Sequence, residues 1–333
     1  MLFLGTVLLS AVGALQPWAA VERAVNYFFR MLPFFFVPLL CKEAKQLWIL
    51  LGVAAFSLLV ADSYALWQGL QGNLRAPAFH SHPMMLAGFL VQWIPVLALV
   101  TAADWGKELS LKNYWRWGLG GLWLLSLAAL VVNGTRGAWL TVLFLLLVLG
   151  ATLLRKHKKA LAVGFVVLVL LLGLAGQHRG LQERVHTLGD ASFQSNSERV
   201  LMWQSAWQMF LDHPLLGVGA QNYEYQYQNH YISPLAQERG QMHAHSNVFQ
   251  MLAEQGIIGF GAFALLFGAI LRRGWQGMRR GMFWGYLLVV ATVGILLQGL
   301  TEFNFGNAAV IRLYWLFAGI AMAGLKLSGE NHF

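Results

Sequence analysis

Apolar residues fill this chain in long continuous runs rather than in an alternating pattern. Several runs of about 18–22 residues carry almost no charge, which is the length that a helix needs to cross a hydrocarbon core roughly 30 Å thick. Membrane-spanning strands alternate apolar and polar positions instead, so the pattern disfavours a β-barrel. The sequence therefore predicts an all-α, polytopic membrane helix bundle that forms a single membrane domain over 1–333. The ten predicted transmembrane helices cover 2–18, 25–41, 47–69, 84–102, 114–132, 135–154, 160–176, 246–271, 282–300 and 307–326.

One long connection, 177–245, separates the seventh predicted span from the eighth. Within it, Ser197 is a candidate N-cap for an amphipathic helix that Pro214 would end. Large apolar residues recur in this helix at helical spacing, so we expect it to lie on the membrane or to pack on the bundle. These residues are Val200, Trp203, Trp207 and Phe210.

Composition supports the membrane class. The chain is 58% apolar and 11% charged, whereas soluble domains carry about 25% charged residues. Cys41 is the only cysteine, which excludes disulfides and cysteine-rich metal sites within one chain. The chain is apolar from Leu2 onward without a basic leader, so we expect a first span there rather than a removable signal peptide.

The orientation follows from the basic residues in the short loops. Alternate loops hold 13 of the 23 basic residues, and this excess marks the cytoplasmic side of a membrane protein. Both termini are then predicted inside, and 177–245 becomes a large periplasmic loop. The 13 residues are Lys42, Lys45, Lys107, Lys112, Arg116, Arg155, Lys156, Lys158, Lys159, Arg272, Arg273, Arg279 and Arg280.

Lysine and arginine divide between the two predicted sides. All eight lysines are cytoplasmic on this map, whereas the outer side has arginine only, although a small sample also produces such a split by chance. The guanidinium fork makes paired hydrogen bonds to phosphate and stays charged when partly buried. The long loop has four arginines against six acidic residues, which argues against nucleic acid as a partner. The outer arginines are Arg23, Arg75, Arg136, Arg179, Arg184, Arg199, Arg239 and Arg312.

Three of these arginines occupy sequence positions that suggest a specific role. Arg136 lies in the turn VVNGTRGAWL between two predicted spans, where it either snorkels to the interface or binds an anion between helices. Arg75 opens RAPAFHSHPMM, which is either a solvated loop or part of a site. Arg199 falls in the first turn of the predicted loop helix, the unfavourable end of the dipole for a cation. It therefore calls for a partner, which Glu198 or a lipid phosphate would provide.

Two histidines stand at the mouth of the eighth span, in MHAHSNVFQMLAEQGIIGF. The imidazole of His245 could take a proton from an attacking hydroxyl, although a lone histidine here is also a common solvated cap. His243 and His245 have a spacing that permits a metal site, but no acidic residue lies close in sequence to complete it. Deeper in the spans, Glu254 and Asp62 are carboxylates that need partners.

Four tyrosines, beginning with Tyr223, alternate with amides in GVGAQNYEYQYQNHYISP. Such rings can stack on sugars while the amides bond sugar hydroxyls. An aromatic belt at the membrane interface explains them equally well.

Taken together, these motifs resemble the O-antigen ligase family. HSNVFQMLAEQGIIG is similar to the family pattern of His, then Ser, Asn or Gln, followed by two spaced glycines, here His245, Ser246, Gly256 and Gly259. The GTRGAW turn looks like the intramembrane arginine of the family, and ERVLMWQSAWQMFLDHPLLGVG looks like its loop helix. RAPAFHSHPMMLA is similar more loosely to the first outer arginine region. Ten is fewer spans than family members usually have, which is compatible with a missing N-terminal pair.

The resemblance implies glycosyl transfer at the periplasmic face of the bacterial inner membrane. The donor would be a glycan on undecaprenyl pyrophosphate, and the acceptor a sugar hydroxyl of lipid A–core in lipopolysaccharide biosynthesis. His245 would be the general base, while Arg136 and Arg199 would stabilise the leaving pyrophosphate without a cofactor or metal. Arg75, His243, Ser246 and Tyr223 would bind substrate. Membrane lipids are the surrounding partner.

Other activities remain open at this point. An O-antigen polymerase or a protein O-oligosaccharyltransferase would use the same chemistry with another acceptor. Polymerases of this pattern often carry two large outer loops and the protein-modifying relatives a longer C-terminal extension, so the single loop and short C-terminal segment favour the ligase. A lipid-linked glycan transporter would use the outer arginines only to bind cargo.

Overall fold

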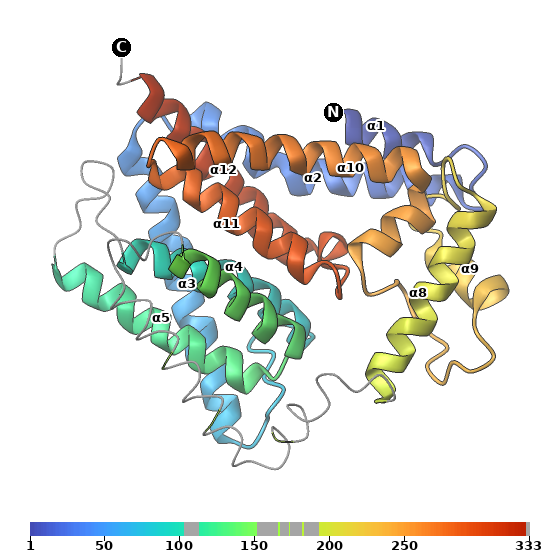
Figure 1. The fold of residues 1–333 in the computed structure, drawn as a ribbon, viewed down its shortest axis with the longest axis horizontal. Coiled ribbons are helices and arrows are strands. Elements are labelled where there is room, and N and C mark those ends of the chain that lie inside the picture. Colours follow the sequence, from blue (N-terminus) through green and yellow to red (C-terminus); the bar gives the residue numbers. More distant parts are fainter. Residues whose placement is uncertain (103–112, 152–165, 167–172, 174–181, 183–192, 331–333) are drawn as a thin grey trace. The chain divides into compact units, whose positions relative to one another are not determined.

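A computed structural model describes residues 1–102, 113–151, 166, 173, 182 and 193–330 (Figure 1). Every regular element in these ranges is helical, in agreement with the all-α prediction. The chain divides into two compact units. Unit 1 comprises Met1–Leu32, Gly189–Leu271 and Gly299–Arg312, and unit 2 comprises Pro33–Leu188, Arg272–Gln298 and Leu313–Phe333.

Unit 2 is built from long apolar helices. It contains α3 (Ala44–Leu70), α4 (Pro83–Ala102), α5 (Asn113–Asn133), a helix over Arg136–Ala151 and α11 (Phe283–Gln298). Helix α4 packs against both α5 and α11, and α5 also packs against α3. The most apolar stretch of α4 is 78% buried, compared with 28% for that of α3, so α4 forms the centre of this unit.

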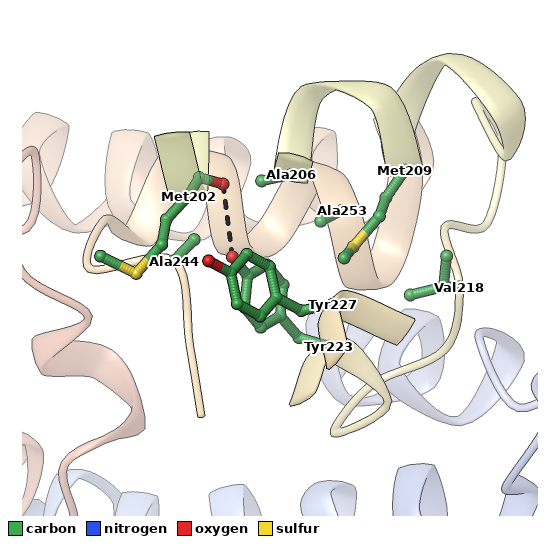
Figure 2. Packing of buried hydrophobic residues seen from close by; sticks show 8 residues of the cluster. All are labelled: Met202, Ala206, Met209, Val218, Tyr223, Tyr227, Ala244 and Ala253. Atoms are coloured by element: carbon green, nitrogen blue, oxygen red, sulfur yellow. Dashed lines mark hydrogen bonds between the residues drawn. The ribbon is translucent and has the colours of Figure 1, made fainter. Parts of the chain in front are cut away.

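Unit 1 carries shorter elements and more loop. It contains α1 (Leu2–Leu9), the first part of α2 (Pro17–Leu40), α8 (Gln194–Asp212), α9 (Tyr223–Gln226), the π-helix η1 (Tyr227–Tyr231) and the 3₁₀ turn η2 (Asn304–Gly306). The first parts of α10 (Asn247–Arg279) and α12 (Ala308–Glu330) complete it. Figure 2 shows its core beneath α8, where Met202, Ala206 and Met209 pack over the rings of Tyr223 and Tyr227.

A break in α10 joins this helix to the loop that follows α8. Gly256 has φ 59° and ψ −163° inside α10, a conformation that only glycine adopts readily. The chain after α8 pairs with the opened backbone, because Ile257 N–H donates to Pro214 O at 2.8 Å and Val218 N–H donates to Ala253 O at 2.9 Å. A Cβ on Gly256 would lie 2.4 Å from the Leu215 backbone. Glycine is therefore required at position 256 for this close approach of the two backbones.

The described residues contain five helices that are long and apolar enough to cross a membrane, and each coincides with a predicted span. They are Ala44–Leu70, Pro83–Thr101, Trp115–Asn133, Asn247–Arg279 and Ala308–Gly329. Helix α4 starts at Pro83, one residue before the predicted span. The predicted span 160–176 lies outside the described residues, and the total of ten stays a prediction.

Two local predictions are wrong. The helix expected over 2–18 ends at Leu9, and Gly13 has φ 84° in the turn that follows. Ser197 is not an N-cap, because α8 begins at Gln194 and the Ser197 hydroxyl bonds back to Gln194 O at 2.9 Å.

The buried face of α8 also differs from the predicted one. It consists of Glu198, Met202, Ser205, Ala206 and Met209. Val200 and Trp207, both assigned to the apolar stripe, are 40% and 43% exposed. Small and flexible side chains face the unit because two full tyrosine rings already fill the space beneath the helix (Figure 2).

Candidate functional site

The centre of the candidate site is the buried carboxylate of Glu302, which contacts two of the predicted site residues. One oxygen accepts a hydrogen bond from the Arg199 guanidinium in an ion pair. The other lies 3.2 Å from His245 Nδ1. The side chains of His245 and Arg199 are 22% and 19% exposed. Unit 1 thus brings α8, the mouth of α10 and the segment after α11 together in one polar array.

The charge on this carboxylate is stabilised by its neighbours. Burial alone would raise the pKa of Glu302, but the hydrogen bond with His245 and the positive charge of Arg199 outweigh it, so the pKa is lowered. An ionised carboxylate accepts hydrogen bonds only. His245 then donates from Nδ1, which leaves Nε2 as the basic nitrogen.

The backbone at His245 is strained. Its φ is 47°, a left-handed conformation that is uncommon for residues other than glycine and costs of order 1–3 kcal/mol. Such strain persists only where the surrounding structure fixes it. The Ala244 N–H, one residue earlier, donates to the Gln250 side chain at 2.7 Å. The turn therefore holds His245 in one orientation at the start of α10.

The segment that carries Glu302 is tied to the same helix start through Asn247. The backbone N–H of Asn247 donates to Gly299 O at 2.7 Å, and its side chain bonds Asn304 Oδ1 at 2.7 Å and Phe305 N at 3.1 Å. Arg30 of α2 adds a hydrogen bond of 2.8 Å to Gly306 O. The position of Glu302 against His245 is thus set by four hydrogen bonds within unit 1.

His243 packs edge to face on His245, with ring centroids 4.3 Å apart. Its pKa is lowered to about 4, mainly by burial and then by the charge of His245, so at neutral pH it carries no charge. Ser246 is 1% exposed, and its hydroxyl accepts the Phe249 N–H at 3.5 Å. Both residues therefore support the turn around His245.

Tyr223 is fully buried in the core beneath α8 (Figure 2). Its ring stacks on Tyr227 at 5.6 Å, and its hydroxyl donates to Met202 O at 3.3 Å. Of the same group, Tyr225 is 43% exposed. The ring of Tyr223 is engaged in packing, which leaves it no open face for a sugar.

The other two predicted arginines belong to unit 2. Arg136 is half-buried at the start of the helix Arg136–Ala151, and Arg75 is exposed. The Asn133 amide, in the turn before Arg136, donates to Ala76 O at 3.0 Å and to Pro83 O at 2.9 Å. This turn and the segment after Arg75 are therefore joined. Participation of the two arginines in the site of unit 1 stays a prediction.

Sequence reasoning missed Glu302. The available signal was a lone acidic residue in the short outer connection between the predicted spans 282–300 and 307–326, on the same side as His245. Sequence reasoning also offered Glu198 as a partner for Arg199. Glu198 instead accepts the backbone N–H of Gln237 at 2.9 Å. Across the described ranges, no group of three or more His, Cys, Asp or Glu side chains has the arrangement of a metal site.

Residues 121–264 match a family model described as O-antigen ligase. This match supports the O-antigen ligase family for this segment of the chain. The matched residues include Arg136, Arg199 and His245, whereas Arg75 and Glu302 lie outside them. A search of curated proteins found no match to the chain.

Similarity to the O-antigen ligase family fits the helical membrane architecture. The family supports an O-antigen ligase or polymerase type of function, with a lipid-linked glycan and a lipid acceptor as the general substrate classes. A histidine with one basic nitrogen, oriented by a buried carboxylate, is suited to removing a proton from an acceptor hydroxyl.

Proposed function

We propose that this protein is an O-antigen ligase, which transfers a glycan from undecaprenyl pyrophosphate to a sugar hydroxyl of lipid A–core. The reaction takes place at the periplasmic face of the bacterial inner membrane. The observation that supports the proposal most strongly is the array of Arg199, Glu302 and His245, with His245 held in a strained backbone conformation.

In this proposal His245 is the general base. Its Nε2 removes the proton of the acceptor hydroxyl while the acceptor oxygen attacks the anomeric carbon of the donor sugar. The bond from that carbon to the pyrophosphate oxygen breaks, and undecaprenyl pyrophosphate leaves with the electron pair. A single displacement inverts the configuration at the anomeric carbon. Glu302 stabilises the imidazolium that forms, as a positioning residue.

The leaving pyrophosphate needs positive charge rather than a proton donor. Arg199 uses one part of its guanidinium for Glu302, and the five N–H donors of the group allow further hydrogen bonds to phosphate. By the family resemblance, Arg136 and Arg75 are further candidates for stabilising the leaving pyrophosphate. No metal ion is required in this scheme, because guanidinium groups stabilise the developing charge.

Some residues first assigned to substrate binding take other roles. Ser246 and Tyr223 hold the turn and the core through internal hydrogen bonds. His243 covers one edge of the His245 ring. The sugar of the acceptor then approaches the open edge of His245, since that side chain is partly exposed.

The test uses purified protein, a lipid-linked glycan and lipid A–core. His245→Ala should lower the transfer rate by about 10²–10⁴-fold, the usual contribution of a general base. His230→Ala is the matched control, because His230 is exposed on η1 and should keep full activity. Transfer at the wild-type rate by His245→Ala would remove the general-base assignment.

The same assay separates the alternatives. Supplying a second lipid-linked glycan or a peptide in place of lipid A–core tests for polymerase and protein-modifying activity. Movement of the lipid-linked glycan across a vesicle membrane, without any covalent product, would favour a transporter. Activity should persist in a chelator, and its loss there would contradict the arginine-based mechanism.

A further inference from the structure

Helix α2 carries Arg23, an arginine of unit 1 whose charge acts on the histidine pair of the candidate site. The Nε atom of Arg23 is buried and has no hydrogen-bond partner among the described residues. A buried guanidinium donor without an acceptor is costly, because it has given up water without replacement. At this atom Arg23 differs from Arg199, whose guanidinium is paired with Glu302.

Arg23 lies near Tyr27 and interacts electrostatically with His243. Its Cζ is 5.7 Å from the ring centre of Tyr27, one turn further along α2, a distance typical of a cation–π contact. Its charge also contributes to the lowered pKa of His243, after burial and the charge of His245. Arg23 thus belongs to the surroundings of the histidine pair in unit 1.

The surroundings of Tyr27 are rich in positive charge. Arg30 lies over the same ring at 5.8 Å. The carboxylate of Glu254, which is 1% exposed, interacts electrostatically with both Arg23 and Tyr27, and it accepts the Tyr223 N–H at 3.3 Å. The Tyr27 hydroxyl is itself buried without a partner in the described part of the chain. Arg23 Nε and the Tyr27 hydroxyl are therefore two buried donors without an acceptor among the described residues, in surroundings that hold two arginine charges and one internal carboxylate.

We propose that Arg23, together with the Tyr27 hydroxyl, binds a phosphoryl group of a lipid substrate. Arg30 supports the site through its charge while holding Gly306. The guanidinium fork and a phenolic hydroxyl are donors that match phosphate oxygens. This proposal rests on the proposed transfer reaction for its substrates, which provide two sources of phosphoryl groups. These are the pyrophosphate of the donor lipid and the phosphates of the acceptor lipid.

The experiment measures binding without turnover. Purified full-length protein is titrated with undecaprenyl pyrophosphate and, separately, with phosphorylated lipid A–core, and the shift in unfolding temperature gives the half-saturating concentration. Arg23→Gln should raise this concentration about tenfold or more for at least one ligand, because a hydrogen bond to a charged group is lost. Tyr27→Phe should raise it about fivefold. Arg23→Lys should recover only part of the loss, since it keeps the charge without the fork.

Arg239→Gln is the matched control, because Arg239 is an exposed arginine of the long loop. It removes the same charge and should leave both titrations unchanged. An effect limited to undecaprenyl pyrophosphate assigns the group to the donor, and an effect limited to lipid A–core assigns it to the acceptor. Unchanged binding of both ligands by Arg23→Gln and Tyr27→Phe overturns the proposal, as does a wild-type protein that binds neither. If Arg23→Gln does not fold, the titrations of Tyr27→Phe and Arg23→Lys with both lipids test the proposal instead.

His245→Ala separates this inference from the proposed function. The variant should bind both lipids as the wild type does while failing to transfer glycan. If wild type and variant transferred glycan equally, the general-base assignment would fail, whereas the two titrations would still report on Arg23.

Discussion

Two buried carboxyl groups, Glu302 in unit 1 and Asp62 in unit 2, have opposite surroundings. Glu302 lies in an irregular segment between α11 and η2 and pairs with Arg199 and His245. Asp62 lies inside the apolar helix α3, where Ser126 of α5 donates to it at 2.5 Å. Its other oxygen has no partner among the described residues.

The difference shows what each group is suited for. A carboxylate between an arginine and a histidine N–H donor keeps its charge at modest cost and can orient a base. A carboxyl group bonded to one hydroxyl in an apolar helix contact has no such support, and it serves better as a neutral link between helices. We therefore assign catalysis-related positioning to Glu302 and a packing role to Asp62.

The strongest test of this contrast is Glu302→Gln. The substitution keeps the size of the side chain but removes the charge that orients and stabilises His245. We expect kcat to fall by about 10²–10⁴-fold with little change in KM for either lipid. Steady-state kinetics with the lipid-linked glycan and lipid A–core measure both values.

A pH profile distinguishes positioning from general damage to the fold. Removing the carboxylate should change the pH dependence of kcat as well as its size, because the orientation of the base depends on this carboxylate. A variant with a reduced rate and an unchanged profile would indicate a merely structural role.

A second contrast concerns the backbone, which is irregular at Gly256 and regular at Gly261 in the same helix. Gly256→Ala should lower the free energy of unfolding by about 1–3 kcal/mol or more, because its positive φ and the nearby Leu215 backbone both oppose a Cβ. Gly261→Ala meets nothing within 4 Å and should be neutral or slightly stabilising. Denaturation of both variants in detergent checks this. Equal effects would mean that the kink tolerates a side chain.

Much of this arrangement follows from sequence periodicity. Long apolar runs predict α3, α4, α5, α10 and α12 because a helix must satisfy all its backbone groups within the membrane. The pattern at His245 also indicates the start of α10 correctly. At one glycine of the same motif, Gly256, the structure shows a close backbone approach.

Sequence periodicity does not predict features that depend on contacts between residues far apart in the chain. The partner of Arg199 is 103 residues away, and nothing local in α8 distinguishes Glu302 from Glu198. The buried face of α8 was mispredicted for the same reason, since the stacked tyrosines select Met202 and Ala206 over the larger Trp207. From the sequence alone, Tyr223 is a candidate sugar-binding ring, whereas in the structure its ring stacks on Tyr227.

A smaller effect is expected in the pH dependence of stability. The pKa of His243 is lowered to about 4, whereas an unfolded histidine has a pKa of about 6.5. As the pH falls, His243 therefore binds a proton at a higher pH in the unfolded chain than in the folded protein. The free energy of unfolding decreases as the pH falls from about 6.5 toward 4. His243→Gln cannot titrate, so between pH 7 and pH 4.5 the wild type should lose about 1–3 kcal/mol more than the variant. Parallel unfolding curves at the two pH values measure the difference, and identical losses would show that His243 titrates normally.

The smallest effect is expected from Asp62→Asn. Asparagine keeps an oxygen that accepts the Ser126 hydroxyl and removes only the capacity for charge, so transfer should stay within about twofold of the wild type and stability within about 1 kcal/mol. Asp62→Leu leaves the Ser126 hydroxyl buried without its partner and should cost about 1–3 kcal/mol in unfolding. If Asp62→Asn instead abolished transfer as Glu302→Gln is expected to do, Asp62 would need its charge for the reaction. The two buried carboxyl groups would then share a function, and the packing role assigned to α3 and α5 at this contact would be wrong.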